Sequence, residues 1–119
     1  MVSLQPPKTY NVAMPADDAV LTEIVRRLVP VYKPERIYLF GSAARGEAGE
    51  DSDYDIALLV APDTPPELKR GDRAFHALRG IPVPIDVLIL DRKYFESQLG
   101  LKASLASTIE REGRLLYAA

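Results

Sequence analysis

The sequence predicts a single domain of the α/β (α+β) class, in which a small sheet is flanked by helices. Its 119 residues fit one domain of ordinary size. Short runs of strand-forming residues are separated by stretches whose apolar side chains have helical spacing, and this alternation predicts mixed structure. The 47% of hydrophobic residues suffice for a core. The absence of cysteine excludes disulfide scaffolds and thiolate metal sites.

The chain is expected to divide into a flexible N-terminal arm, residues 1–15, and a folded domain, residues 16–119. The arm is polar and proline-bearing, with no sustained period. We find no signal-peptide pattern and no apolar run of about 20 residues, so a cytoplasmic location is expected. The 15 basic and 17 acidic side chains are spread along the chain, without the basic stripe typical of nucleic-acid binders.

The first helix is expected over residues 17–29, where Asp17 or Asp18 can cap the exposed amides. Pro30 should end this helix, because proline disfavours a helical conformation in the residue before it. One face carries apolar side chains at helical spacing: Val20, Leu21, Ile24 and Leu28.

Residues 36–40 form an apolar run between Pro34 and Gly41, and they are expected to form the first buried strand. The loop that follows reads Gly-Ser-Ala-Ala-Arg-Gly. A strand that leads into Gly-Ser and a short helical turn can point backbone amides at a phosphate. Gly41 permits close approach, Ser42 adds a hydroxyl and Arg45 a guanidinium. Taken alone, the Gly-Ser pair also fits an ordinary turn, and Arg45 also fits a surface position.

Asp53 and Asp55 begin a second predicted strand, residues 53–60. Residues two apart in a strand point to the same side, so both carboxylates should face one site while Tyr54 points the other way. Like charges this close repel, and a positive group should compensate them. Hard cations such as Mg2+ prefer oxygen ligands, so a metal satisfies this need, and an arginine partner would also serve.

A helix is expected over residues 66–78, where Pro66 suits the first turn. Its inward residues should be Leu68, Phe75 and Leu78. His76 is the only histidine, and it is expected at the surface or core edge. A histidine-based triad and a site with several histidines are therefore excluded.

Residues 85–90 read as a third strand that is too hydrophobic to be a solvated edge of the sheet. Asp86 is the exception within this run. A carboxylate in an apolar strand costs free energy unless it is paired or bound to a metal. Considered together with Asp53 and Asp55, it predicts a metal site built from three carboxylates on adjacent strands.

Two short helices and a final strand are expected in the C-terminal third. The first helix covers residues 93–99 with Asp91 as its cap, and the second covers residues 102–112 and is ended by Gly113. Residues 114–117 should form a strand at the sheet edge. Tyr94 and Phe95 of the first helix are expected near the core, and Leu105 and Ile109 lie one turn apart in the second.

The spacing of Gly41-Ser42, ten intervening residues and Asp53-Tyr54-Asp55 resembles the signature of the nucleotidyltransferase superfamily with the DNA polymerase beta-like fold. With Ile-Asp-Val around Asp86, the pattern resembles the minimal nucleotidyltransferase (MNT) proteins, the antitoxin half of HEPN-MNT toxin-antitoxin pairs. The resemblance extends from about residue 17 to the end. It implies a small mixed sheet flanked by helices.

The resemblance also implies a metal-dependent transfer of AMP from ATP to a hydroxyl, namely a protein adenylyltransferase activity on a tyrosine of a partner HEPN toxin, which makes the chain an antitoxin. Two Mg2+ ions and a hetero-oligomer with the toxin are expected. The implied catalytic and metal-binding residues are Asp53, Asp55 and Asp86. The implied nucleotide-binding residues are Gly41, Ser42 and Arg45.

Two other functions remain open at this point. One is an antitoxin-like binding module that neutralises its partner by docking, without nucleotidyl transfer. The other is a nucleotidyltransferase that acts on a small molecule or on RNA. The three carboxylates argue against a pure binding module, and the acidic balance of the chain provides no basic track for RNA.

Overall fold

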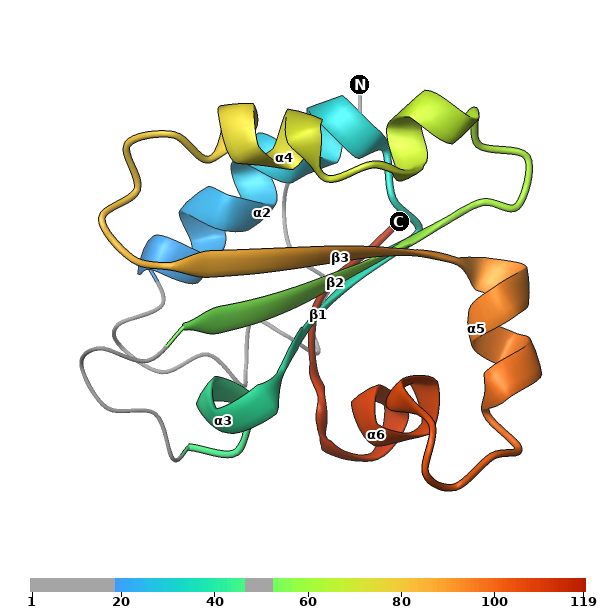
Figure 1. The fold of residues 1–119 in the computed structure, drawn as a ribbon. Helices are drawn as coiled ribbons and strands as arrows, with labels where there is room; N and C mark the ends of the chain where they lie inside the picture. The colour runs from blue at the N-terminus through green and yellow to red at the C-terminus, as the bar shows by residue number, and fades with distance from the viewer. Residues whose placement is uncertain (1–18, 47–52) are drawn as a thin grey trace.

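The structure, a computed structural model, describes residues 19–46 and 53–119. Four strands form one sheet in the order β3-β2-β1-β4 (Figure 1). The strands are β1 (Arg36–Phe40), β2 (Tyr54–Val60), β3 (Ile85–Asp91) and β4 (Arg114–Ala118). β1 is antiparallel to β2 and β4, whereas β2 and β3 are parallel. The predicted small mixed sheet is confirmed, and the predicted N-terminal arm lies outside the described residues.

Helices cover both faces of the sheet (Figure 1). α2 (Ala19–Tyr32), the 3₁₀ turn η1 (Pro66–Lys69) and α4 (Asp72–Ala77) lie on one side, which we call the α2/α4 face. α5 (Arg92–Gln98) and α6 (Leu105–Glu112) lie on the α5/α6 face, and α3 (Gly41–Ala44) follows directly from β1. None of the helices in the described part of the chain is long and apolar enough to cross a membrane.

The core consists of two buried clusters, one on each face of the sheet. Because successive strand residues point to opposite faces, β1 and β2 supply alternate side chains to the two clusters. On the α2/α4 face these are Ile37, Leu39, Ile56 and Leu58. On the α5/α6 face they are Tyr38, Ala57 and Leu59.

The predicted end of the first helix before Pro30 is wrong, because α2 continues through this residue to Tyr32. Tyr32 is buried, and its hydroxyl donates to the carbonyl of Arg70 at 2.6 Å and accepts from the N–H of Ala74 at 2.9 Å. These contacts hold the last turn of α2 in place. The helix then ends at Lys33, which has a φ of +47°. The expected caps Asp17 and Asp18 lie outside the described residues.

The prediction of one continuous helix over residues 66–78 is wrong, because the chain is not helical between η1 and α4. Arg70 is extended, with φ −109° and ψ 151°, so η1 and α4 are separate elements. The interruption shifts which side chains face inward. Ala74 and Leu78 are buried, whereas Phe75, predicted to face the core, is 73% exposed.

The prediction that β3 is not an edge strand is also wrong, since β3 is the outer strand beside β2. Its apolar side chains are half-buried, because helices on both faces cover only part of them. The predicted strand over residues 114–117 is confirmed as β4, at the opposite edge.

The two C-terminal helices follow the prediction in part. Asp91 caps α5 and accepts from the N–H groups of Lys93 at 2.7 Å and Tyr94 at 3.1 Å. Phe95 and Ile109 are buried as expected. The expected position of Tyr94 near the core is wrong, since its side chain is 56% exposed, and Leu105 is 45% exposed. Both side chains line a groove among β3, α5 and α6.

Gly113 ends α6 as predicted, but the reason is a close approach and not a left-handed backbone. Its φ is −72°, and its N–H donates to the carbonyl of Ile109 at 2.8 Å. A Cβ at this position would lie 2.5 Å from that carbonyl oxygen.

The substitution Gly113→Ala is therefore expected to lower the free energy of unfolding by about 1–3 kcal/mol, the usual cost of overpacking. Urea denaturation measures this loss. Gly100→Ala is the matched control, because a Cβ there meets no atom within 4 Å. Equal stability of the two variants would contradict the steric explanation.

Candidate active site

Asp55 and Asp86 lie directly opposite one another on the neighbouring parallel strands β2 and β3. Paired residues on adjacent strands point to the same face, and the strands are about 4.8 Å apart. Ala57, two residues after Asp55, belongs to the cluster on the α5/α6 face, so both carboxylates belong to that face. Tyr54 packs against the cluster on the other face, as predicted.

Asp53 lies immediately before β2, two residues from Asp55, and is exposed. The pKa of Asp55 is raised, first by burial and then by the negative charges of Asp86 and Asp53. Each of these causes disfavours the ionised form. The three predicted carboxylates therefore act on one another electrostatically.

The chemistry of this donor set fits a hard divalent cation. Within the described residues, no group of three or more His, Cys, Asp or Glu side chains is arranged to hold a metal ion by itself. However, Mg2+ usually binds one or two protein carboxylates, and water and substrate phosphates complete its coordination. Asp55 and Asp86 provide such a pair, and a cation would offset the repulsion that raises the pKa of Asp55.

Gly41 places the Gly-Ser loop against this carboxylate pair. Its φ is +75°, and a Cβ built on it would lie 3.2 Å from Cγ of Asp55 and closer still to a carboxylate oxygen. Phe40, the preceding residue, is the register partner of Asp55 on β1. A side chain at Gly41 would displace the carboxylate, so the backbone of the loop and Asp55 are in direct proximity.

Ser42 lies in the short helix α3, and Arg45 is the residue that caps the end of this helix. Ser42 is half-buried in α3. The backbone N–H of Arg45 donates to the carbonyl of Gly41 at 3.3 Å. The guanidinium of Arg45 forms a salt bridge of 3.5 Å with Glu112 at the end of α6. No local pattern in the sequence predicts this salt bridge, because Arg45 and Glu112 lie far apart in the chain.

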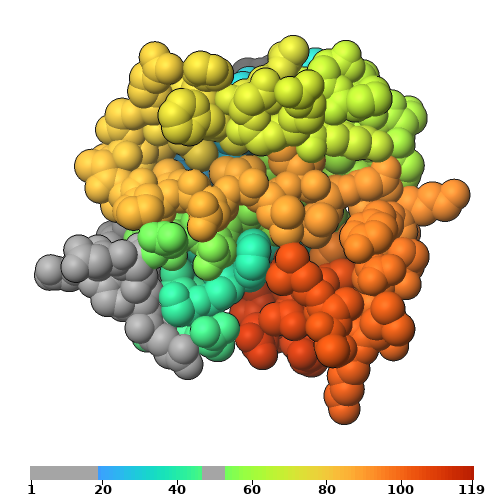
Figure 2. Space-filling model, viewed as in Figure 1, coloured from blue at the N-terminus to red at the C-terminus, as the bar shows by residue number. Residues whose placement is uncertain are grey.

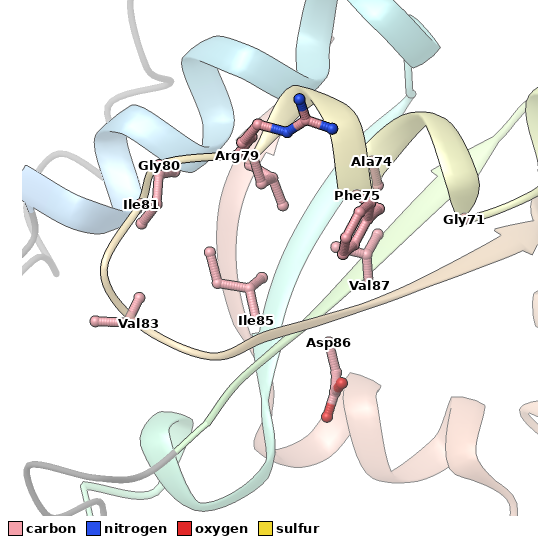
Figure 3. Close-up of a pocket in the computed structure, with 11 residues that line it drawn as sticks. Gly71, Ala74, Phe75, Arg79, Gly80, Ile81, Val83, Ile85, Asp86 and Val87 are labelled. Carbon is pink, nitrogen blue, oxygen red and sulfur yellow. The ribbon is translucent and has the colours of Figure 1, made fainter.

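A groove of about 470 Å³ between α4 and β3 lies on the other face of the sheet. Ile85 and Val87 point into it, whereas the carboxylate of Asp86 points to the opposite side of β3 (Figure 3). This groove is mostly apolar, and Phe75 and Arg79 also line it. Asp86 also lines this groove, but its carboxylate points away from it, so the groove and the carboxylate site lie on opposite faces of β3.

Comparison with known proteins gives a family and a set of similar folds. Residues 20–116 match the model of a family described as a nucleotidyltransferase domain. A toxin-antitoxin crystallised with AMP-PNP is 26% identical, with a TM-score of 0.57, over 87% of this chain and 74% of the other. A mutant of the toxin-antitoxin MntA-HpeT is 25% identical, with a TM-score of 0.53, over 88% of this chain and 75% of the other.

A nucleotidyltransferase-like structure from Sulfolobus solfataricus has the same fold. It is 19% identical, with a TM-score of 0.58, over 98% of this chain and 93% of the other. The search of curated proteins gave no significant match.

Proposed function

We infer that this chain, which belongs to the nucleotidyltransferase domain family, transfers AMP from ATP to a tyrosine hydroxyl of a partner HEPN toxin and thereby acts as an antitoxin. The observation that carries this proposal is the direct opposition of Asp55 and Asp86, with the backbone of Gly41 against Asp55. The two toxin-antitoxin structures described above support the choice of partner, and the AMP-PNP in one of them supports ATP as the donor.

In the proposed site, the chain mainly positions its substrates and balances charge. Asp55 and Asp86, with Asp53 beside them, would hold Mg2+, and two ions are expected. When bound, Mg2+ neutralises phosphate charge and activates the attacking hydroxyl. The backbone of Gly41 and the hydroxyl of Ser42 hold the two phosphates that leave.

The transfer is a single displacement at the α-phosphorus of ATP. The acceptor oxygen forms a bond to this phosphorus, and the bond from the phosphorus to the bridging oxygen breaks. Pyrophosphate leaves with the electron pair of that bond. Asp86 lies nearest the outer edge of the sheet, and its carboxylate takes the proton of the acceptor hydroxyl. Arg45 can assist on the phosphate side if it leaves its salt bridge with Glu112.

The test is mass spectrometry of the protein encoded by the gene next to that of this chain, after co-expression and incubation with ATP and Mg2+. The wild type should add the mass of AMP to a tyrosine of that protein, whereas Asp53→Ala should add none, because it lacks one carboxylate of the site. Asp63→Ala is the control, because Asp63 is exposed and lies beyond the other end of β2.

Two outcomes would contradict the proposal. If the partner binds and is neutralised without gaining mass, neutralisation by docking is the better account. If Asp53→Ala modifies the partner as fast as the wild type does, the carboxylate site is not the catalytic one.

A further inference from the structure

The order of strands indicates the side from which the acceptor reaches the site. This inference rests on the proposed function. In an in-line displacement, the attacking and leaving oxygens lie on opposite sides of the phosphorus. In the proposed reaction the leaving phosphates would lie at Gly41 and Ser42, which follow β1, and the reacting phosphorus at the carboxylates of β2 and β3. Because the order is β3-β2-β1, the acceptor approaches across the outer edge of β3.

Two grooves flank this edge, one on each face of the sheet. The groove of about 470 Å³ contains Phe75 of α4 and Val87 of β3. A second groove, of about 260 Å³, lies among β3, α5 and α6 and contains Leu88, Tyr94 and Leu105. Leu88 is two residues from Asp86, so it lies on the same face as the carboxylate. The segments that line both grooves lie on one side of the molecule (Figure 2).

Exposed apolar side chains are concentrated in these grooves. Four large apolar side chains of the described residues are strongly exposed: Phe75 at 73%, Leu101 at 58%, Tyr94 at 56% and Leu105 at 45%. All of them except Leu101 line one of the two grooves. Exposed aromatic side chains beside apolar grooves are typical of protein interfaces, where they act as anchors.

The polar groups of the grooves indicate the chemistry of the occupant. The second groove contains no charged side chain, and the hydroxyl of Ser104 is used within the chain, since it donates to the carbonyl of Gln98 at 2.8 Å and accepts from the N–H of Ser107 at 3.0 Å. The first groove carries Arg79, which forms no salt bridge within residues 19–46 and 53–119. A protein partner with an apolar surface fits both grooves, and a carboxylate of this partner could pair with Arg79 in the first groove. A sugar or a nucleic acid would not match two grooves that are mainly apolar.

We propose that the outer edge of β3 and its two grooves form the docking surface for the protein that carries the acceptor hydroxyl. We call it the β3-edge surface, and its members are Phe75, Arg79, Val87, Leu88, Tyr94 and Leu105. The partner covers the exposed aromatic side chains on both faces of β3, and its hydroxyl reaches Asp86 between them. Nucleotide binding at Gly41 and Asp55 does not depend on this surface.

The experiment measures three quantities for each full-length variant: the Kd for the protein encoded by the neighbouring gene, the rate of AMP transfer to it and the Kd for AMP-PNP with Mg2+. Phe75→Ser and Tyr94→Ser should each weaken partner binding roughly tenfold or more, since one interface anchor contributes 1.4 kcal/mol or more. Arg79→Glu should also weaken it, by a factor that shrinks at high salt. The Kd for AMP-PNP should stay unchanged. Leu101→Ser is the matched control, because it removes an equally exposed side chain outside both grooves.

The outcomes separate this inference from the proposed reaction. If the wild type transfers AMP and the three variants bind the partner as the wild type does, the docking surface is wrong and the reaction stands. If the wild type binds the partner but transfers nothing, the reaction is wrong, and the affinities of the variants still decide the docking surface. If light scattering shows a wild-type dimer that Phe75→Ser converts to a monomer, the surface joins two copies of this chain and the inference is overturned.

Discussion

Asp55→Asn is expected to lower the rate of AMP transfer on the order of 10³-fold or more, without lowering the free energy of unfolding. Activity falls because Asp55 is the carboxylate that lies between Gly41 and Asp86. Stability does not fall, because the amide has the same shape and removes a negative charge that is repelled by Asp86 and Asp53. Transfer of labelled AMP and thermal unfolding without divalent cations measure the two effects.

The pH dependence of unfolding provides a second readout. The pKa of Asp55 in the folded state is raised above its ordinary value of 3.8. A raised carboxyl pKa favours folding while the group is protonated, and this contribution is lost as the pH rises through the folded pKa. The Tm of Asp55→Asn should therefore exceed that of the wild type, by a difference that grows as the pH rises above about 4. Addition of Mg2+ should raise the Tm of the wild type and have much less effect on the Tm of the variant.

Asp63→Asn is the control for both effects, because Asp63 is an exposed carboxylate away from the site. An Asp55→Asn variant that unfolds at a lower temperature than the wild type at neutral pH would show that Asp55 is structural. A variant that keeps full activity would remove Asp55 from the catalytic group.

Gly41→Ala is expected to lower the rate of AMP transfer roughly 10²-fold, because a small displacement of a positioning group can cost that much. Two effects act together at this residue. Alanine disfavours the φ of +75°, and its Cβ would collide with the carboxylate of Asp55. The strained backbone alone should lower the free energy of unfolding by about 1 kcal/mol. Steady-state transfer assays and urea denaturation measure the two losses.

Two other glycines separate these effects. Gly46 has the same φ of +75° and Gly80 has a φ of +91°, but a Cβ at either position meets no atom within 4 Å. Gly46→Ala and Gly80→Ala should therefore lose stability and keep most of their activity. If Gly80→Ala lost activity as severely as Gly41→Ala, general destabilisation and not the contact with Asp55 would explain the result.

Local sequence patterns predicted those parts of the fold that depend on local physics. The run bounded by Pro34 and Gly41 matches β1 exactly in its bounds, and Asp91 caps α5 as its position predicts. Pro30 does not end α2, because tertiary contacts of Tyr32 keep the last turn of this helix in place. Local periodicity does not predict the exposure of Phe75, because the break after η1 depends on how α4 packs.

The candidate site was predictable to the extent that it depends on strand periodicity. The two-residue spacing of Asp53 and Asp55 and the lone carboxylate at Asp86 indicated a shared location, and the β2–β3 register brings Asp55 and Asp86 together. The salt bridge from Arg45 to Glu112 could not be predicted, since it depends on where α6 packs against the sheet. The grooves beside β3 were missed for the same reason.

The pairing of Asp55 with Asp86 makes the site depend on the register between β2 and β3. Successive residues of a strand point to opposite faces of the sheet, so only some registers bring both carboxylates to one face. A shift of β3 by one residue would turn Asp86 toward α4 and place an aliphatic side chain beside Asp55. The turns between β2 and β3 lie outside the ladder, so their length can change without altering this alignment as long as α4 keeps its buried side chains in place. The strand alignment itself tolerates no shift by a single residue.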